Sequence, residues 1–363
     1  MIVLVNKRWF QILTFFIMLF LLIWLISVTN FIFDPMFKYI GAVAFPFIAA
    51  GILFYLTKPI MSFLEKLKIK RTIAIILVFI LLLVIGIVII RYIAPIAQNQ
   101  FINLMDNIPK MVTWAQDLII YWQANQTAIP KEINDTITHF TNNLQTYIEN
   151  IFNYVFDFIG SLISFIMSLI LVPFFLFFML KDGDKFLPFI TRIFEKKKAD
   201  NIRSLLSKVN NTLASFIQGQ LIVSFILGVL LFIGYVAIGL KYSLTLGLFA
   251  MIMNVVPFIG PFIAVIPALI VGAFQDPMMI LWVSLVTLVG QQVESNLISP
   301  NVMGRALHMH PLTIITVILA AGSIAGFIGI LFAVPFYSVI KTVIVHFYGT
   351  YRESKSSKED ALI

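Results

Sequence analysis

The sequence contains no cysteine and few charged side chains. Without cysteine, disulfide bonds, thiolate metal sites and cysteine nucleophiles are excluded. Charged residues make up 12% of the chain, whereas they make up about a quarter of an ordinary soluble domain. Hydrophobic residues make up 60%, which is too apolar for a water-soluble globule. We therefore expect much of the protein surface to face lipid.

Sequence motifs of enzymatic chemistry are also missing. The chain has no HExxH, GxSxG or GxxxxGK[ST] motif, so zinc proteolysis, serine hydrolysis and P-loop nucleotide binding lack their usual signatures. His308 and His310 are two residues apart and do not share a helix face, so they predict no metal site. Asp182-Gly183-Asp184 is more typical of a helix end than of a catalytic acid pair. We predict no enzymatic activity, no catalytic residue, no metal and no cofactor.

Long apolar runs are the dominant feature of the sequence. A helix needs about 20 apolar residues to cross a hydrocarbon core of ~30 Å. The runs that reach or approach this length are 9–31, 37–57, 72–93, 151–180, 213–240, 244–274, 277–293 and 311–347. The first is longer than the core of a signal peptide, so we expect it to be retained. The sequence thus predicts an all-α, polytopic protein with about eight membrane-spanning segments.

Basic residues cluster between the apolar runs. The formal net charge is +8, but lysine and arginine do not follow one polar face, so nucleic acid is not an expected partner. One cluster lies at 58–71 and a larger one at 181–208. Because loops rich in lysine and arginine stay in the cytoplasm, both termini are predicted to be cytoplasmic.

The composition divides the chain into six parts. Residues 1–96 hold N-terminal transmembrane helices, 97–150 a polar helical insertion outside the cytoplasm, and 151–180 a further transmembrane helix. Residues 181–211 form a basic cytoplasmic segment, either amphipathic helices on the inner surface or a solvated loop. Residues 212–348 are the C-terminal transmembrane core, and 349–363 are a cytoplasmic tail. We expect the transport site in the C-terminal core.

The stretch 291–300 places a carboxylate and several amides at the end of an apolar run. An ionisable residue within a span costs ~2.5 to 3.5 kcal/mol, so one that is retained usually faces a partner, a cavity or a pathway. We predict a polar pathway around Glu294, formed with Gln291, Gln292 and Asn296. Alternatively, Glu294 lies beyond the membrane boundary and pairs with Arg305.

Two apolar runs carry helix-breaking residues. In the first, Asn254 precedes Pro257, Gly260, Pro261 and Pro267; in the second, the candidate gate or hinge residues are Pro311, Gly322, Gly326, Gly329 and Pro335. Such residues predict broken or re-entrant helices, whose freed carbonyls must be buried in protein or line a wet cavity. A plain packing kink is the alternative, and Asn254 then forms a bond between helices.

These blocks, in this order, resemble the autoinducer-2 exporter (AI-2E) family, also called PerM-like proteins. The matching residues are Asn254 to Pro261 with Pro267-Ala268, Gln292 to Pro300 with Gly304, His310-Pro311-Leu312, Gly326, Gly329 and Ala333-Val334-Pro335, preceded by Pro46-Phe47 and Pro59. The resemblance covers nearly the whole chain. It implies polytopic proteins of bacterial plasma membranes, some described as quorum-sensing signal exporters and others as sodium(lithium)/proton antiporters, with homo-oligomeric assembly expected.

Together, these features predict a secondary transporter in the lipid bilayer that exports a small hydrophilic solute or signal such as autoinducer-2 by alternating access. Cation/proton exchange is the alternative within transport, with Glu294 binding a proton and a cation in turn. An alternative of another class is a non-transporting membrane scaffold that binds envelope partners through its polar insertion.

Overall fold

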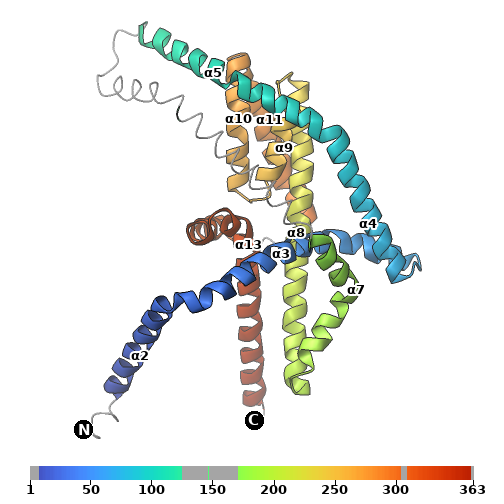
Figure 1. The fold of residues 1–363 in the computed structure, drawn as a ribbon, viewed down its shortest axis with the longest axis vertical. Coiled ribbons are helices and arrows are strands. Elements are labelled where there is room, and N and C mark those ends of the chain that lie inside the picture. Colours follow the sequence, from blue (N-terminus) through green and yellow to red (C-terminus); the bar gives the residue numbers. More distant parts are fainter. Residues whose placement is uncertain (1–7, 125–145, 147–170, 304–308, 361–363) are drawn as a thin grey trace.

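The computed structural model describes residues 8–124, 146, 171–303 and 309–360. All regular elements within these residues are helical, which confirms the all-α prediction. Figure 1 shows one long helix, α8 (Lys196–Ala237), along the long axis, with shorter helices beside its upper half and the later part of α13 (Pro311–Asp360) near its lower half.

The N-terminal half consists of long helices with few interruptions. They are α2 (Arg8–Val28), α3 (Asn30–Lys66), α4 (Arg71–Val88), the π-helical turn η1 (Ile89–Ile93) and α5 (Ala94–Ala124). Because α4, η1 and α5 follow each other without a break, the predicted boundary at residue 97 falls within a continuous helical segment. The six-part division of the chain stays a prediction.

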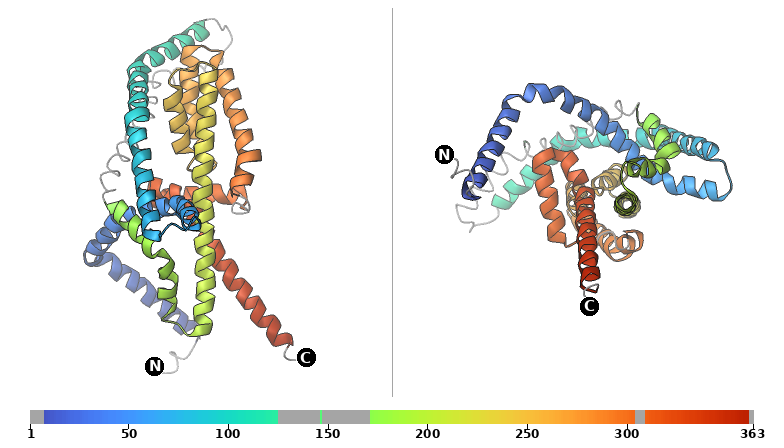
Figure 2. Two further views of the ribbon diagram at one scale, coloured as in Figure 1. Left: turned by 90° about the vertical axis from the view of Figure 1, so that its right-hand side faces the viewer. Right: turned by 90° about the horizontal axis from the view of Figure 1, so that it is seen from below.

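The C-terminal half is more finely divided. Its elements are α7 (Val172–Thr191), α8 (Lys196–Ala237), α9 (Ser243–Met253), α10 (Ile259–Gln275), α11 (Met279–Val293), the π-helical turn η3 (Glu294–Ile298), α12 (Ser299–Met303) and α13 (Pro311–Asp360). In Figure 2, α8 passes beside both the upper group of helices and the lower part of the molecule. With 42 residues, α8 is long enough to join the two.

Five helices within the described ranges are long and apolar enough to cross a membrane. They cover Trp9–Val28, Pro46–Lys66, Arg71–Trp114, Lys198–Ala237 and Gly329–Gly349, and shorter apolar helices cover Ser243–Met253, Ile259–Gln275 and Pro311–Gly326. The predicted run 244–274 is two helices, and 311–347 contains a kink. Most of the run 151–180 lies outside the described residues, so the count of eight spans stays a prediction.

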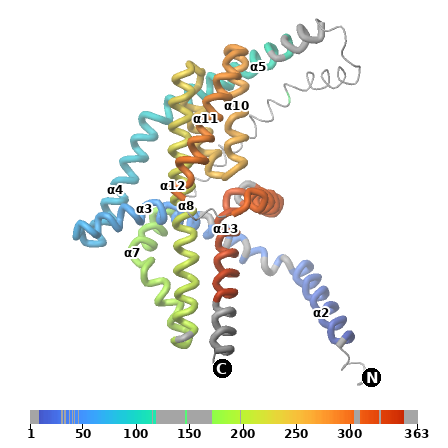
Figure 3. Tube along the Cα trace, turned by 180° about the vertical axis from the view of Figure 1, so that it is seen from behind, coloured from blue at the N-terminus to red at the C-terminus, as the bar shows by residue number. Residues whose placement is uncertain are grey.

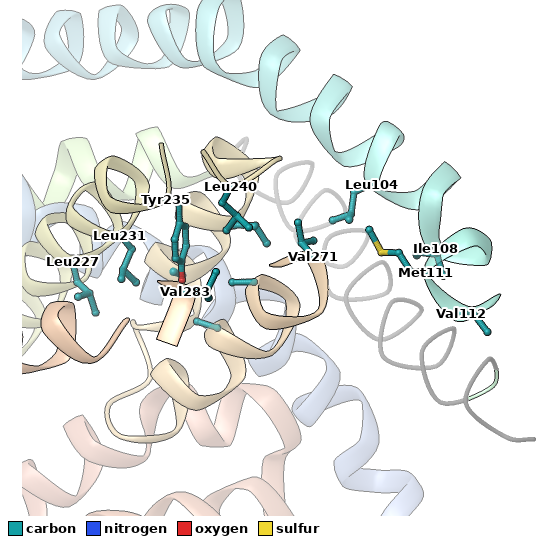
Figure 4. Packing of buried hydrophobic residues seen from close by; sticks show 14 residues of the cluster. Leu104, Ile108, Met111, Val112, Leu227, Leu231, Tyr235, Leu240, Val271 and Val283 are labelled. Carbon is teal, nitrogen blue, oxygen red and sulfur yellow. The ribbon is translucent and has the colours of Figure 1, made fainter. Parts of the chain in front are cut away.

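The largest hydrophobic core joins α5 to the C-terminal helices. Leu104, Ile108, Met111 and Val112 of α5 are buried in one cluster with residues of α8 to α11, including Tyr235. Figure 4 shows these α5 side chains beside that cluster. The first part of the predicted polar insertion is therefore packed against the core through an apolar face.

The predicted basic segment is mostly helical. It forms the end of α7 and the beginning of α8. The guanidinium group of Arg71 donates hydrogen bonds of 3.1 and 2.6 Å to the Leu180 carbonyl oxygen and one of 2.6 Å to the Asp184 carboxylate. These bonds tie the start of α4 to the middle of α7, where Lys181 and Lys185 interrupt its apolar sequence.

Polar contacts join the N-terminal part of α8 to α13, and Figure 3 shows both helices from behind. The Lys208 ammonium lies 3.3 Å from Nδ1 of His346, and Nε2 of His346 lies 2.7 Å from Oδ1 of Asn201. One turn along each helix, the hydroxyls of Thr212 and Thr342 are 3.2 Å apart. The contacts hold the last predicted span against the beginning of α8.

The orientation of the chain in the membrane can be tested because the native sequence has no cysteine. We expect an Asp117→Cys variant to react with a membrane-impermeant maleimide in intact cells. A Lys185→Cys variant should react only after permeabilisation, because its basic surroundings predict a cytoplasmic position. Both positions are exposed. Labelling of Lys185→Cys in intact cells would contradict the predicted topology.

The docking of α5 is tested by Leu104→Ala, since Leu104 is 2% exposed in the core. Loss of a buried leucine typically costs about 2–5 kcal/mol, so thermal unfolding in detergent should shift to a clearly lower temperature. Ile102→Ala, at a position on the same helix that is 46% exposed, is the control. Equal unfolding temperatures for the two variants would show that α5 is not docked.

Candidate transport site

Residues 254–258, within the apolar run 244–274, lie between the end of α9 at Met253 and the start of α10 at Ile259. Pro257 is one of them, and Phe258 has a φ of 66°, an uncommon conformation for a residue with a side chain. Gly260 and Pro261 follow in the first turn of α10, where proline is tolerated because its missing N–H would have no helical partner.

Gly260 allows the two helices to meet closely. A Cβ atom at this position would collide with the carbonyl oxygen of Met253 and lie 2.9 Å from Cα of Asn254. Pro267, further along α10, is buried in the helix interior. The glycine and the prolines therefore shape a tight junction between the end of α9 and the start of α10.

A side chain of α8 bonds the backbone of the junction. Asn254 is 1% exposed, and its backbone carbonyl accepts a hydrogen bond of 2.6 Å from Nε2 of Gln220. Sequence analysis singled out Asn254 but missed Gln220 and its neighbour Ser224, which lie in a long apolar run. Their polarity within that run was the available signal, but it did not reveal which helix they face.

The predicted polar pathway around Glu294 lies where α11 passes into the π-helical turn η3. Such π turns are frequent at functional sites. Nδ2 of Asn296 donates a hydrogen bond of 2.8 Å to Oε1 of Gln292, and the Ser295 hydroxyl donates one of 2.8 Å to the Gln291 carbonyl. Asn296, Gln292 and Ser295 are exposed at the surface.

Glu294 is half-buried, and the described residues contain no ion-pair partner for it. Arg305, the predicted partner, lies outside the described residues. Nε2 of Gln291 is buried and has no hydrogen-bond partner in the described part of the chain. The turn thus combines an exposed amide pair with a partly buried carboxylate and a buried amide.

Helix α8 contacts both polar regions. Val223 of α8 is buried with Ile298 and Met303, which follow Glu294. Gln220, on the neighbouring turn, contacts Asn254 at the break. Packing against α8 therefore positions both regions, and a shared pathway between them stays a prediction.

The last apolar segment begins at Pro311 and has a kink at Ala325 and Gly326. Gly326 has a φ of 57° and a ψ of −138°, a combination that is accessible to glycine and strained for other residues. Gly322 lies against the Ile330 side chain and Gly329 against the Ala321 carbonyl, so the kink is compact. Pro335 lies in the continuing helix, and the gate or hinge role of these residues stays a prediction.

Both carboxylates of the Asp182-Gly183-Asp184 motif form ion pairs. Asp182 pairs with Lys185 at 2.7 Å, and this hydrogen bond lowers the pKa of the exposed Asp182 carboxyl. A general acid at neutral pH needs a raised pKa instead. The described residues contain no group of three or more His, Cys, Asp or Glu side chains that could hold a metal ion. His308 lies outside them.

Comparison with known proteins identifies the family of the chain. The model of the AI-2E family of transporters matches residues 13–349. The chain belongs to this family. The resemblance found in the sequence is thereby confirmed, and the protein is a multi-pass membrane protein of a transporter family.

Relatives are similar over most of their length. YueF of Bacillus subtilis, named as a transport protein, is 35% identical over 330 residues, which are 88% of each chain. PerM of Escherichia coli K12, named as a permease, is 25% identical over 316 residues, 86% of this chain and 89% of its own. A protein of Halobacillus andaensis named as a sodium-lithium/proton antiporter is 22% identical over 325 residues, 84% of this chain and 90% of its own.

The tight junction between α9 and α10 is tested by Gly260→Ala. The added methyl would meet the Met253 carbonyl, and such overpacking typically costs about 1–3 kcal/mol. We expect a lower unfolding temperature in detergent. In the control Gly51→Ala, on α3, the added Cβ has no neighbour within 4 Å. If both variants unfold at the temperature of the unmodified protein, the junction is looser than described.

Proposed function

We propose that the protein is a secondary transporter of the bacterial plasma membrane that exports a small hydrophilic solute by alternating access. The observation that supports this most directly is the discontinuity between α9 and α10, where buried Asn254 contacts Gln220 of α8. Transporters commonly place their sites at discontinuous helices, because the freed backbone groups there can bind polar ligands.

The polar turn at Glu294 provides a second element of the proposed pathway. Its exposed amides lie on a helix that is otherwise apolar, with Leu288 and Val289 of the preceding turn also exposed. Such a surface suits a hydrated passage formed when helices move relative to α8. Since the chain has no P-loop motif, we propose an ion gradient as the source of energy.

The proposed cargo is a small, hydroxylated signal of the autoinducer-2 type. The family is named for this class of solute, and neutral amide and hydroxyl groups suit its recognition. Homo-oligomeric assembly, implied by the family resemblance, remains part of the proposal.

Sodium or lithium/proton exchange is a second candidate. It is favoured by Glu294, a half-buried carboxylate without an ion-pair partner among the described residues, and by the antiporter named among the relatives. In this proposal, the Glu294 carboxylate binds a proton and a cation alternately. A carboxylate paired with arginine or lysine would be less suited to this exchange.

Reconstitution in liposomes tests both candidates in one preparation. We expect the purified protein to release trapped autoinducer-2, and Glu294→Gln to lower the rate by about tenfold, which corresponds to about 1.4 kcal/mol in the barrier. Internal pH is followed in parallel under imposed sodium or lithium gradients. Cation-driven pH changes that disappear in Glu294→Gln would instead establish exchange and place solute export second.

The control is Glu65→Gln, which removes an exposed carboxylate on α3. It should behave like the unmodified protein in both assays. If the protein is well folded but releases no solute and changes no pH, the transport proposal is wrong, and the scaffold alternative becomes the better explanation.

A further inference from the structure

Three buried polar residues lie where α8 meets the break between α9 and α10. Gln220, Ser224 and Asn254 are 5%, 1% and 1% exposed. Gln220 and Ser224 lie on α8, and Asn254 follows the last residue of α9. We call these three side chains the α8–α9 polar group.

The geometry of α8 directs Ser224 toward α9. Gln220, Ser224 and Gly228 follow at intervals of four residues and therefore share one helix face. At one end of this face, Gln220 bonds the Asn254 carbonyl at 2.6 Å. At the other end, a Cβ atom on Gly228 would lie 2.5 Å from Cβ of Met251. Ser224, between them, faces the C-terminal end of α9.

Two buried polar atoms of the α8–α9 polar group lack a hydrogen-bond partner among the described residues. They are Oγ of Ser224 and Nδ2 of Asn254. Other buried hydroxyls, those of Thr57, Thr191 and Ser338, bond the carbonyl one turn back in their own helix. Ser224 makes no such bond, although its helix offers the same carbonyl. A buried polar atom without a partner is unfavourable, so this arrangement points to a ligand.

Apolar packing encloses the polar group on two sides. Toward the N-terminus of α8, Phe216 is buried in a cluster with Val256. Toward its C-terminus, Leu227 is buried in the cluster that contains Ala250 of α9. Along α8, and along the end of α9 with the residues that follow it, buried polar residues therefore lie between buried apolar residues. A ligand at this level would lie between two apolar clusters.

The chemistry of the group suits a small monovalent cation. The Ser224 hydroxyl is one possible oxygen ligand, and Oε1 of Gln220 is a second, since Nε2 of Gln220 already bonds the Asn254 carbonyl. The third is Oδ1 of the Asn254 amide, which takes the place of Nδ2 when the amide group rotates by 180°. The negative end of the α9 dipole lies at the same place. None of the three side chains is ionisable, so a divalent ion would lack compensating charge.

We propose that Gln220, Ser224 and Asn254 bind one dehydrated monovalent cation, Na⁺ or Li⁺. This inference rests on the proposed transport function and adds a coupling-ion site that is separate from Glu294. Sodium sites at the C-terminal ends of broken helices follow the same physical logic, because unwound carbonyls and the helix dipole both favour a cation there.

Binding is tested with the full-length protein in detergent. The unfolding temperature is measured while Na⁺ replaces N-methylglucamine at constant ionic strength, since a ligand that binds the native state stabilises it. We expect Na⁺ to raise the unfolding temperature of the unmodified protein. Ser224→Ala and Asn254→Leu should weaken the apparent Na⁺ affinity at least about tenfold. No Na⁺ dependence in the unmodified protein would overturn the proposal.

The matched control is Ser338→Ala, which removes a hydroxyl that is 5% exposed and bonded to Val334 at 2.8 Å. It should lower the unfolding temperature but keep the Na⁺ effect. Ser224→Ala should do the opposite: without Na⁺ it should unfold at the same or a higher temperature, because it removes an unpaired hydroxyl. A Na⁺ effect that is unchanged in Ser224→Ala and Asn254→Leu would place the cation elsewhere and overturn the assignment.

A charged variant gives an independent readout. Asn254→Asp adds a carboxylate to the site, so we expect a higher apparent Na⁺ affinity than in the unmodified protein. If the group only holds water, Asn254→Asp would bind Na⁺ no better, which would contradict the proposal. Since these measurements need no transport, liposomes without flux would reject the proposed function while Na⁺ stabilisation in detergent still supported the site.

Discussion

The close contact between α8 and the helices of the C-terminal half is the constraint on which the rest of the structure depends. Gly228 and Gly247 remove side chains where α8 and α9 approach, and Gly234 and Gly290 do the same for α8 and α11. Small residues are effective in membranes, since helices there associate through packing and hydrogen bonds rather than by leaving water. With α8 fixed, the break after α9 and the turn after α11 each acquire a defined neighbour.

Those two polar regions differ in their access to solvent, although both lie against α8. The side chains of Gln292 and Asn296 pair with each other at the surface. Those of Ser224 and Asn254 are buried between two apolar clusters. An exposed pair of amides can exchange its partner for water at little cost, whereas a buried amide or hydroxyl depends on the groups that are buried with it. A transporter that couples two ligands would benefit from such unequal environments.

Local chemistry in the sequence predicted the helices and their interruptions. Apolar runs indicated the long helices, and Pro257, Gly260 and Gly326 marked the break and the kink because they limit backbone geometry wherever they occur. Tertiary packing was harder to predict. The buried apolar residues of α5 lie in a segment of polar composition, and nothing local showed that they pack against α8 to α11. The roles of Gln220 and Ser224 likewise depend on which helix they face. The π turn at Glu294 contains no proline or glycine, so no local signal in the sequence predicts it.

The His346 ring of α13 contacts the N-terminal part of α8 and constrains the alignment of these two helices. An ammonium group only donates hydrogen bonds, so Nδ1 of His346 accepts from Lys208, and the hydrogen on Nε2 is donated to Asn201. The two partners are seven residues apart, about two turns of α8. A slip of α8 by a single residue relative to α13 would rotate both partners away from the ring. The contacts of this one ring thus fix both the longitudinal position and the rotation of α8 relative to α13.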